Sequence, residues 1–192
     1  MKARRCLLAV LTLTLPALAS AHPGHVLNEG FAAGVMHPWL GMDHVAAMLA
    51  VGMWAAQMQG RMRWLVPASF VSLMLTGAAL GMSGIHLNAV EQGIAASVCV
   101  LGLLIASAVQ LPAWVCLALT GGFAMFHGYA HGAEAPLQNH ALHYMTGFAL
   151  STLTLHGLGF MLAQRLVRHQ QQRYVRWTGA ALAVSGLVMF AA

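Results

Sequence analysis

The chain has 192 residues, of which 59% are hydrophobic and only 7% are charged. A typical soluble domain carries about 25% charged residues, so this composition excludes an ordinary soluble domain and indicates a surface that faces lipid. The formal net charge of +5 comes from short basic clusters without interleaved aromatic residues, and this pattern gives no indication of nucleic-acid binding.

Residues 1–21 have the three parts of a secretory signal peptide. These parts are a basic n-region, an apolar run at residues 6–18, and the cleavage site Ala19-Ser20-Ala21. We expect cleavage to leave a mature chain of residues 22–192 whose first residue, His22, lies outside the membrane. An uncleaved signal anchor is the alternative, and the position of the small residues disfavours it.

Six apolar runs follow, each long enough for a bilayer-crossing helix of about 20 residues. They lie near residues 30–57, 63–84, 90–109, 111–132, 139–164 and 174–191. The sequence therefore predicts an all-α, polytopic membrane bundle of six helices over residues 22–192. His37-Pro38 and Gly41 interrupt the first run, and interrupted helices in transporters commonly line a cavity.

The arginines agree with an outer N-terminus. In that orientation, two cytoplasmic loops and their flanks contain Arg61, Arg63, Arg165, Arg168, Arg173 and Arg176. The predicted outer loops contain no Lys or Arg, as the positive-inside rule requires. We expect a multi-pass protein of a bacterial inner membrane with both mature ends in the periplasm.

The acidic residues and most histidines gather toward the outer half of the predicted bundle. The acids are Glu29, Asp43, Glu91 and Glu134, and the histidines are His22, His25, His37, His44, His86, His127, His131, His140 and His143. His156 lies deeper and His169 lies in an inner loop. A carboxylate inside the membrane is costly unless it is paired or coordinated, so this pattern predicts an outward-facing metal site.

The first motif is His37-Pro38-Trp39-Leu40-Gly41-Met42-Asp43-His44. On an ideal helix its two histidines lie on nearly one face, roughly 10 Å apart. Both can bind one ion at about 2 Å only if the helix is distorted between them. Otherwise the ion moves stepwise, and either arrangement suits a permease better than a storage site.

The second motif is Phe126-His127-Gly128-Tyr129-Ala130-His131-Gly132-Ala133-Glu134. Its two histidines are one helical turn apart, so one face presents two imidazoles and a carboxylate. A lone buried histidine is more often an ordinary core residue, but two such clusters together favour a metal site. Glu91 is a candidate ligand or gate, although the helix dipole also favours an acid at this position.

Each of the remaining histidines allows two interpretations. His22 and His25, with Glu29, either capture metal loosely at the mature N-terminus or belong to a polar tail. His140, His143 and His156 are either relay residues or ordinary packed residues.

Imidazole and carboxylate ligands without thiolate suit Ni²⁺, Co²⁺, Zn²⁺ or Cu²⁺, and the residues alone leave this choice open. The motifs H-P-x4-D-H and F-H-G-Y-A-H-G-x-E resemble those of the HupE/UreJ family of nickel permeases, and the resemblance runs from about His37 to about Gly159. It implies a six-span inner-membrane protein that supplies nickel, with cobalt as the alternative, for hydrogenase or urease maturation. The metal residues it implies are His37, Asp43, His44, Glu91, His131 and Glu134, with His127 beside them.

The sequence contains no P-loop, so we expect secondary or facilitated transport driven by the membrane potential rather than by ATP. The expected partners are a divalent metal ion and membrane lipids, and a homo-oligomer is left open. We expect neither enzymatic activity nor a resident cofactor. The rival interpretations are an intramembrane zinc hydrolase, a haem protein with axial histidines, and a periplasm-facing metal sensor.

Overall fold

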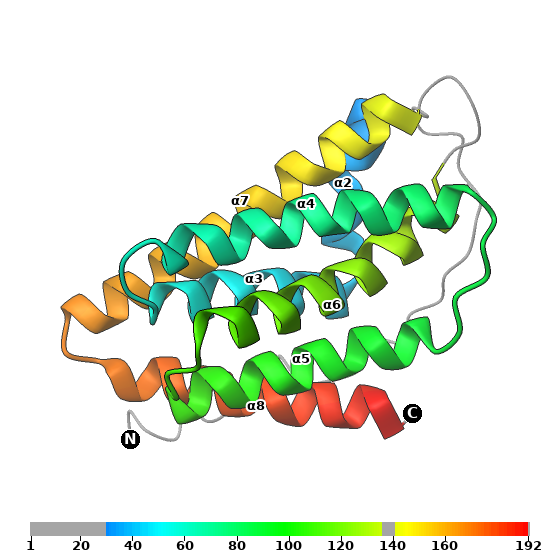
Figure 1. Cartoon of the computed structure of the whole chain (residues 1–192). Helices are drawn as coiled ribbons and strands as arrows, with labels where there is room; N and C mark the ends of the chain where they lie inside the picture. The colour runs from blue at the N-terminus through cyan, green and yellow to red at the C-terminus, as the bar shows by residue number, and fades with distance from the viewer. Residues whose placement is uncertain (1–29, 136–140, 192) are drawn as a thin grey trace.

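The computed structural model describes residues 30–135 and 141–191, and every regular element in these ranges is an α-helix (Figure 1). The helices are α2 (Phe31–Leu40), α3 (Met42–Ala56), α4 (Met62–Met82), α5 (Val90–Ser107), α6 (Ala113–Ala133), α7 (Ala141–Arg168) and α8 (Gln172–Ala191). The prediction of an all-α fold is confirmed. The predicted signal peptide, His22, His25, Glu29 and His140 lie outside the described residues.

Five of these helices, α4 to α8, are long and apolar enough to cross a membrane. The first predicted span corresponds to α2 and α3 together, and α3 alone is shorter, with 15 residues. Large apolar side chains point outward all along the bundle: Trp64 is 65% exposed, Leu142 78% and Leu187 61%. Such a surface is unfavourable in water and suits lipid.

The first span breaks at Gly41. This residue has φ −101 and ψ 116, an extended conformation that ends α2 at Leu40 and lets α3 begin at Met42. Pro38, which the sequence also suggested as an interruption, lies inside α2 and does not end it. The break gives the chain a change of direction between His37 and Asp43, so their side chains need not follow one helical face.

Close helix pairs build the bundle: α4 packs on α6, α5 on α8, and α7 on α2 and α3. Glycines make these approaches possible. A Cβ atom at Gly128 or Gly132 of α6 would collide with the backbone carbonyls of Met74 or Ala78 in α4. Small residues allow this closeness in lipid, where helix association depends on packing rather than on the hydrophobic effect. Because these glycines directly follow His127 and His131, the α4–α6 contact also holds the histidines in place.

From α3 to α8 successive helices run in opposite directions along the bundle, so the loops gather at its two ends (Figure 1). The loops 57–61, 108–112 and 169–171 share one end, and the loop 83–89, the last turn of α6 and the first turn of α7 share the other. All six arginines of the described residues lie at or near the first end: Arg61, Arg63, Arg165, Arg168, Arg173 and Arg176. The bundle therefore has one basic end and one end without Lys or Arg among the described residues.

Candidate metal centre

The candidate centre lies toward the end of the bundle that lacks arginine, between the α2–α3 break and the C-terminal half of α6. His37 lies in the last turn of α2. Asp43 and His44 lie in the first turn of α3. His127, His131 and Glu134 come from α6 and its C-cap. The break at Gly41 and the close α4–α6 contact are thus the two features that position the site.

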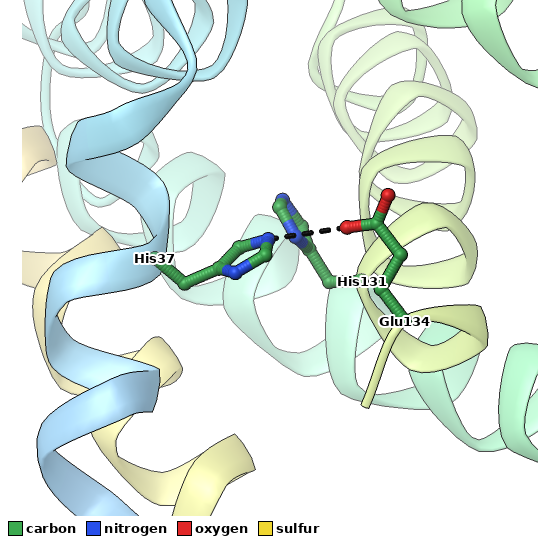
Figure 2. A group of neighbouring side chains, drawn as sticks. All are labelled: His37, His131 and Glu134. Carbon is green, nitrogen blue, oxygen red and sulfur yellow. Dashed lines mark ion pairs between the residues drawn. The ribbon is translucent and has the colours of Figure 1, made fainter. Parts of the chain in front are cut away.

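Three side chains form an outer group near the end of α6: His37, His131 and Glu134 (Figure 2). One ligand atom from each lies within 4.8 Å of the others. His37 Nε2 donates to Glu134 Oε2 over 3.2 Å, and this hydrogen bond lowers the pKa of the Glu134 carboxyl. The group presents two imidazoles and a carboxylate, and a small closing movement would bring all three within about 2 Å of one divalent ion.

A second group lies next to it, around His44. Asp43 Oδ1 accepts hydrogen bonds from the backbone N–H of His44, over 2.9 Å, and from its Nδ1, over 3.0 Å. The ring centroid of His44 lies 4.2 Å from that of His131 and 5.0 Å from that of His127. The His37 and His131 centroids are 4.6 Å apart. The four imidazoles therefore form a continuous series in the order His37, His131, His44, His127.

The two ends of this series differ in burial, and His44 within it has a side chain that is 12% exposed. The Glu134 side chain is 62% exposed and that of His37 30%, whereas His131 is 2% exposed and His127 fully buried. Several ring nitrogens here have no hydrogen-bond partner among the described residues: His44 Nε2, His127 Nδ1 and both nitrogens of His131. Buried polar atoms are nearly always hydrogen-bonded, so these free donors and acceptors indicate a place for a ligand.

One further buried histidine lies beyond this series. His156 of α7 is 3% exposed, and neither ring nitrogen has a partner in the part of the chain that the structure describes. The Phe70 ring contacts both His127 and His156, with centroids 5.7 Å and 5.2 Å away. The backbone of His156 packs against Gly52, which is about 12 Å farther along α3 than His44.

Aromatic side chains line the side of the site that faces α7. The Phe148 ring lies 4.2 Å from that of His131, and the Tyr144 ring lies 5.7 Å from that of His37. The Trp39 indole N–H donates to Ser151 Oγ over 2.7 Å and joins α2 to α7. Sequence reasoning missed these aromatic residues and Phe70, because an aromatic residue in an apolar span has no local feature that separates a site wall from ordinary core.

The structure brings six of the seven predicted metal residues together: His37, Asp43, His44, His127, His131 and Glu134. Glu91 is separate. It is exposed in the first turn of α5, and no hydrogen bond or ion pair joins it to another described residue. His86 and His143 are also exposed and lie outside the series.

Comparison with known proteins gives two matches that cover nearly the whole chain. The family described as "HupE / UreJ protein" matches residues 9–189. The curated "Protein HupE" of Rhizobium leguminosarum bv. viciae is 40% identical over 189 residues, which is 98% of this chain and 98% of that protein. No solved structure gives a significant match.

Proposed function

We propose that this chain, which belongs to the HupE/UreJ family, imports nickel ions across the bacterial inner membrane for hydrogenase or urease maturation. Cobalt fits the same ligands and is the alternative cargo. Transport is secondary or facilitated, and the protein is a permease rather than an enzyme.

The observation that carries this proposal is the series of imidazoles that leads from exposed Glu134 to fully buried His127. Neighbouring ring centroids in the series are 4.6, 4.2 and 5.0 Å apart. An ion bound to one nitrogen therefore reaches the next by a shift of a few ångströms. A storage or structural site would instead gather its ligands around one point.

The charges of the site suit a divalent cation. Neutral imidazoles supply nitrogen ligands, while Asp43 and Glu134 supply two negative charges, and no Lys or Arg of the described residues lies at this end of the bundle. A dipositive ion that has lost its water is costly in lipid unless it is coordinated and neutralised. We assign Glu134 to the first contact with the ion and Asp43 to neutralisation farther in.

We assign His156 as the next ligand that the ion meets on its way toward the arginine end of the bundle. A cavity of about 170 Å³ lies nearer the arginine end, lined by Trp54, Gln57, Met58 and Cys116, among others. Its lining on α3 begins one turn or less beyond Gly52, the residue that packs on His156. These features favour an exit path over a closed metal sensor.

The distribution of the arginines supports the orientation that we propose. Cytoplasmic loops of membrane proteins are enriched in Lys and Arg, so the arginine end faces the cytoplasm and Glu134 faces the periplasm. With α2 and α3 counted as one crossing, the bundle has six crossings and both mature ends are periplasmic. An inside-negative potential then draws a divalent ion inward with about 4.6 kcal/mol per 100 mV.

A zinc hydrolase deserves a direct test, because two histidines and a glutamate are also the ligand set of some catalytic zinc sites. In that interpretation His37, His131 and Glu134 hold zinc and leave one position for water. The protein would then release product from a labelled lipid or ester in the presence of Zn²⁺, and it would move no nickel.

The test is uptake of radioactive nickel into proteoliposomes that contain the purified chain, with an inside-negative potential imposed. A His37→Ala/His44→Ala double variant removes one histidine from each group, and His86→Ala, an exposed loop histidine, is the matched control. We expect saturable accumulation that the double variant loses and the control keeps. Binding without accumulation would favour the sensor, and zinc-dependent turnover of a labelled lipid would favour the hydrolase.

A further inference from the structure

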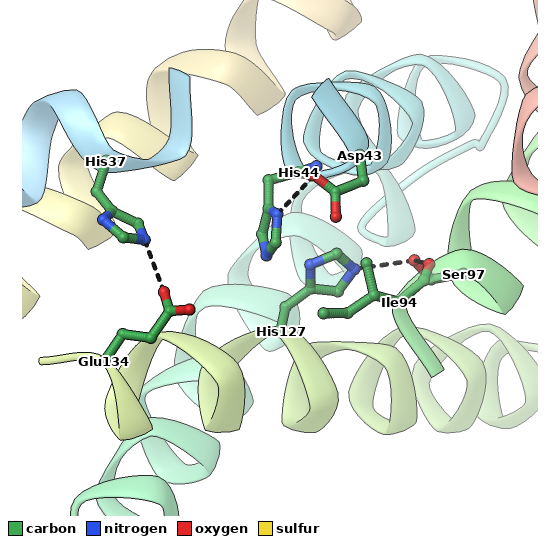
Figure 3. A network of polar contacts seen from close by, with 7 residues as sticks. All are labelled: His37, Asp43, His44, Ile94, Ser97, His127 and Glu134. Carbon is green, nitrogen blue, oxygen red and sulfur yellow. Dashed lines mark hydrogen bonds and ion pairs between the residues drawn. The ribbon is translucent and has the colours of Figure 1, made fainter. Parts of the chain in front are cut away.

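Ser97 of α5 makes the deepest polar contact of the imidazole series. It is fully buried. Its Oγ lies 2.9 Å from His127 Nε2 and 2.6 Å from the backbone carbonyl oxygen of Ile94 (Figure 3). Neither motif of the sequence contains Ser97.

The number of protons available decides the direction of these two hydrogen bonds. A serine hydroxyl has one proton, and a carbonyl oxygen can only accept. At 2.6 Å the Ile94 carbonyl must receive that proton, because two oxygens this close without one would repel each other. Ser97 Oγ is then left as an acceptor, so His127 Nε2 carries the proton and donates it. The Nδ1 atom of a neutral His127 therefore has a free lone pair.

The same reasoning applies to His44. An ionised carboxylate only accepts, so His44 Nδ1 carries the proton that is donated to Asp43 Oδ1. The free lone pair of His44 is therefore on Nε2. This atom and His127 Nδ1 are both buried without a hydrogen-bond partner among the described residues. In Figure 3 the two atoms lie on the facing sides of the two rings.

We propose that Ser97 is a positioning residue that fixes the tautomer of His127, so that His127 Nδ1 and His44 Nε2 form a second, inner position for the metal ion. This inference rests on the proposed transport function and extends it to two successive ion positions. The outer position is the group of His37, His131 and Glu134, and His131 lies between the two positions. Mutation of a residue that orients a ligating histidine through its second nitrogen typically lowers metal affinity 10- to 100-fold.

The chain offers matched variants for a test. Ser97→Ala removes the acceptor for His127, and Ser97→Thr keeps a hydroxyl at the same place. Ser107→Ala is the control, because Ser107 also lies on α5 and donates to a backbone carbonyl, but it is exposed and distant in sequence from Ser97.

Two measurements on the full chain in lipid nanodiscs separate positioning from folding. The first is ¹⁵N NMR of labelled histidines without metal at about pH 8, where imidazoles are ordinarily neutral; it reports which nitrogen of His127 carries the proton. The second is equilibrium dialysis with radioactive nickel, which counts bound ions and gives their affinities. We expect His127 to be protonated on Nε2, and two nickel ions to bind.

In Ser97→Ala we expect the Nε2-protonated form of His127 to be no longer the major tautomer. We also expect one of the two nickel affinities to fall about 10- to 100-fold. Ser97→Thr should restore both properties, and Ser107→Ala should change neither. Protonation of wild-type His127 on Nδ1 would overturn the inference, as would a weaker affinity in Ser97→Ala with an unchanged tautomer. If wild-type His127 is protonated on Nε2 but no nickel binds, the proposed function and the inner metal position both fail, while the role of Ser97 in fixing the tautomer stands.

Discussion

The imidazole of His131 lies 4.2 Å from that of His44, centroid to centroid, although the two residues come from α6 and α3. On its other side His131 lies 4.6 Å from His37. The rings of both histidines of the first motif, His37 and His44, thus pack against the same imidazole, that of His131. A histidine from the second motif lies between them and makes the series continuous.

Removing His131 should interrupt this series. In His131→Ala we expect the initial rate of nickel uptake to fall at least about tenfold, because an orienting or ligating group at a metal site typically contributes 10- to 100-fold. His143→Ala, an exposed histidine of the neighbouring helix α7, should keep the wild-type rate. Proteoliposome uptake measures both, and a normal rate in His131→Ala would show that ions bypass His131.

His156 should matter for passage and not for capture. In His156→Leu the groups around His37 and His44 remain intact, so we expect nickel binding in equilibrium dialysis to keep its affinity within about threefold. Accumulation inside proteoliposomes should fall by about tenfold or more, as for loss of a metal ligand. Wild-type accumulation in this variant would remove His156 from the path.

The glycine that follows His131 gives a steric test. A Cβ at Gly132 would collide with the Ala78 carbonyl, so Gly132→Ala must separate α6 from α4 and displace His131. Overpacking of this kind costs about 1–3 kcal/mol, and we expect lower thermal stability together with slower uptake.

Gly122→Ala is the control for Gly132→Ala, because Gly122 lies on the same helix and has nothing within 4 Å of its added Cβ. It should be neutral or slightly stabilising, since alanine favours the helix by about 0.5–1 kcal/mol over glycine. Equal effects of the two variants on stability would show that α6 does not approach α4 closely enough for a Cβ at Gly132 to meet the Ala78 carbonyl.

The Glu134 carboxylate should contribute to metal binding across the whole neutral pH range. The hydrogen bond from His37 lowers the pKa of Glu134, so this carboxylate stays ionised throughout the neutral range and loses its charge only at more acidic pH. Metal ligands must be deprotonated to bind, so Glu134→Gln should weaken nickel binding by the same factor at pH 8 and at pH 6. Dialysis of the wild type and of Glu134→Gln at both pH values tests this, and a factor that shrinks toward pH 6 would show that the pKa of Glu134 is not lowered.

Glu91 should act at a distance, since it is exposed and apart from the imidazole series. If it attracts cations to the entrance, Glu91→Gln should slow uptake severalfold at low ionic strength. The difference should shrink as salt shortens the Debye length to about 8 Å at 0.15 M. A defect that is independent of salt would instead make Glu91 a direct ligand or a gate.

Much of the fold could be predicted from the sequence because hydropathy is a local property. Every helix from α4 to α8 lies close to a predicted apolar run, since a chain in lipid must satisfy its backbone hydrogen bonds within each span. The break in the first span was also predicted, although it falls at Gly41 alone and Pro38 stays within α2. The grouping of His127, His131 and Glu134 on one side of α6 follows from helical periodicity.

Sequence by itself thus determined that this chain is a helical membrane protein with two histidine-rich motifs, because composition, span length and helical spacing are set by residues near one another in the chain. Only the tertiary structure decided that His131 lies between His37 and His44, that Ser97 contacts His127, that Phe70 contacts His156, and that Glu91 lies apart. These relationships depend on how closely and at what rotation the helices pack. Glycine-to-carbonyl contacts between distant segments, such as Gly132 on Ala78, set both quantities, and no local pattern specifies which carbonyl a glycine will meet.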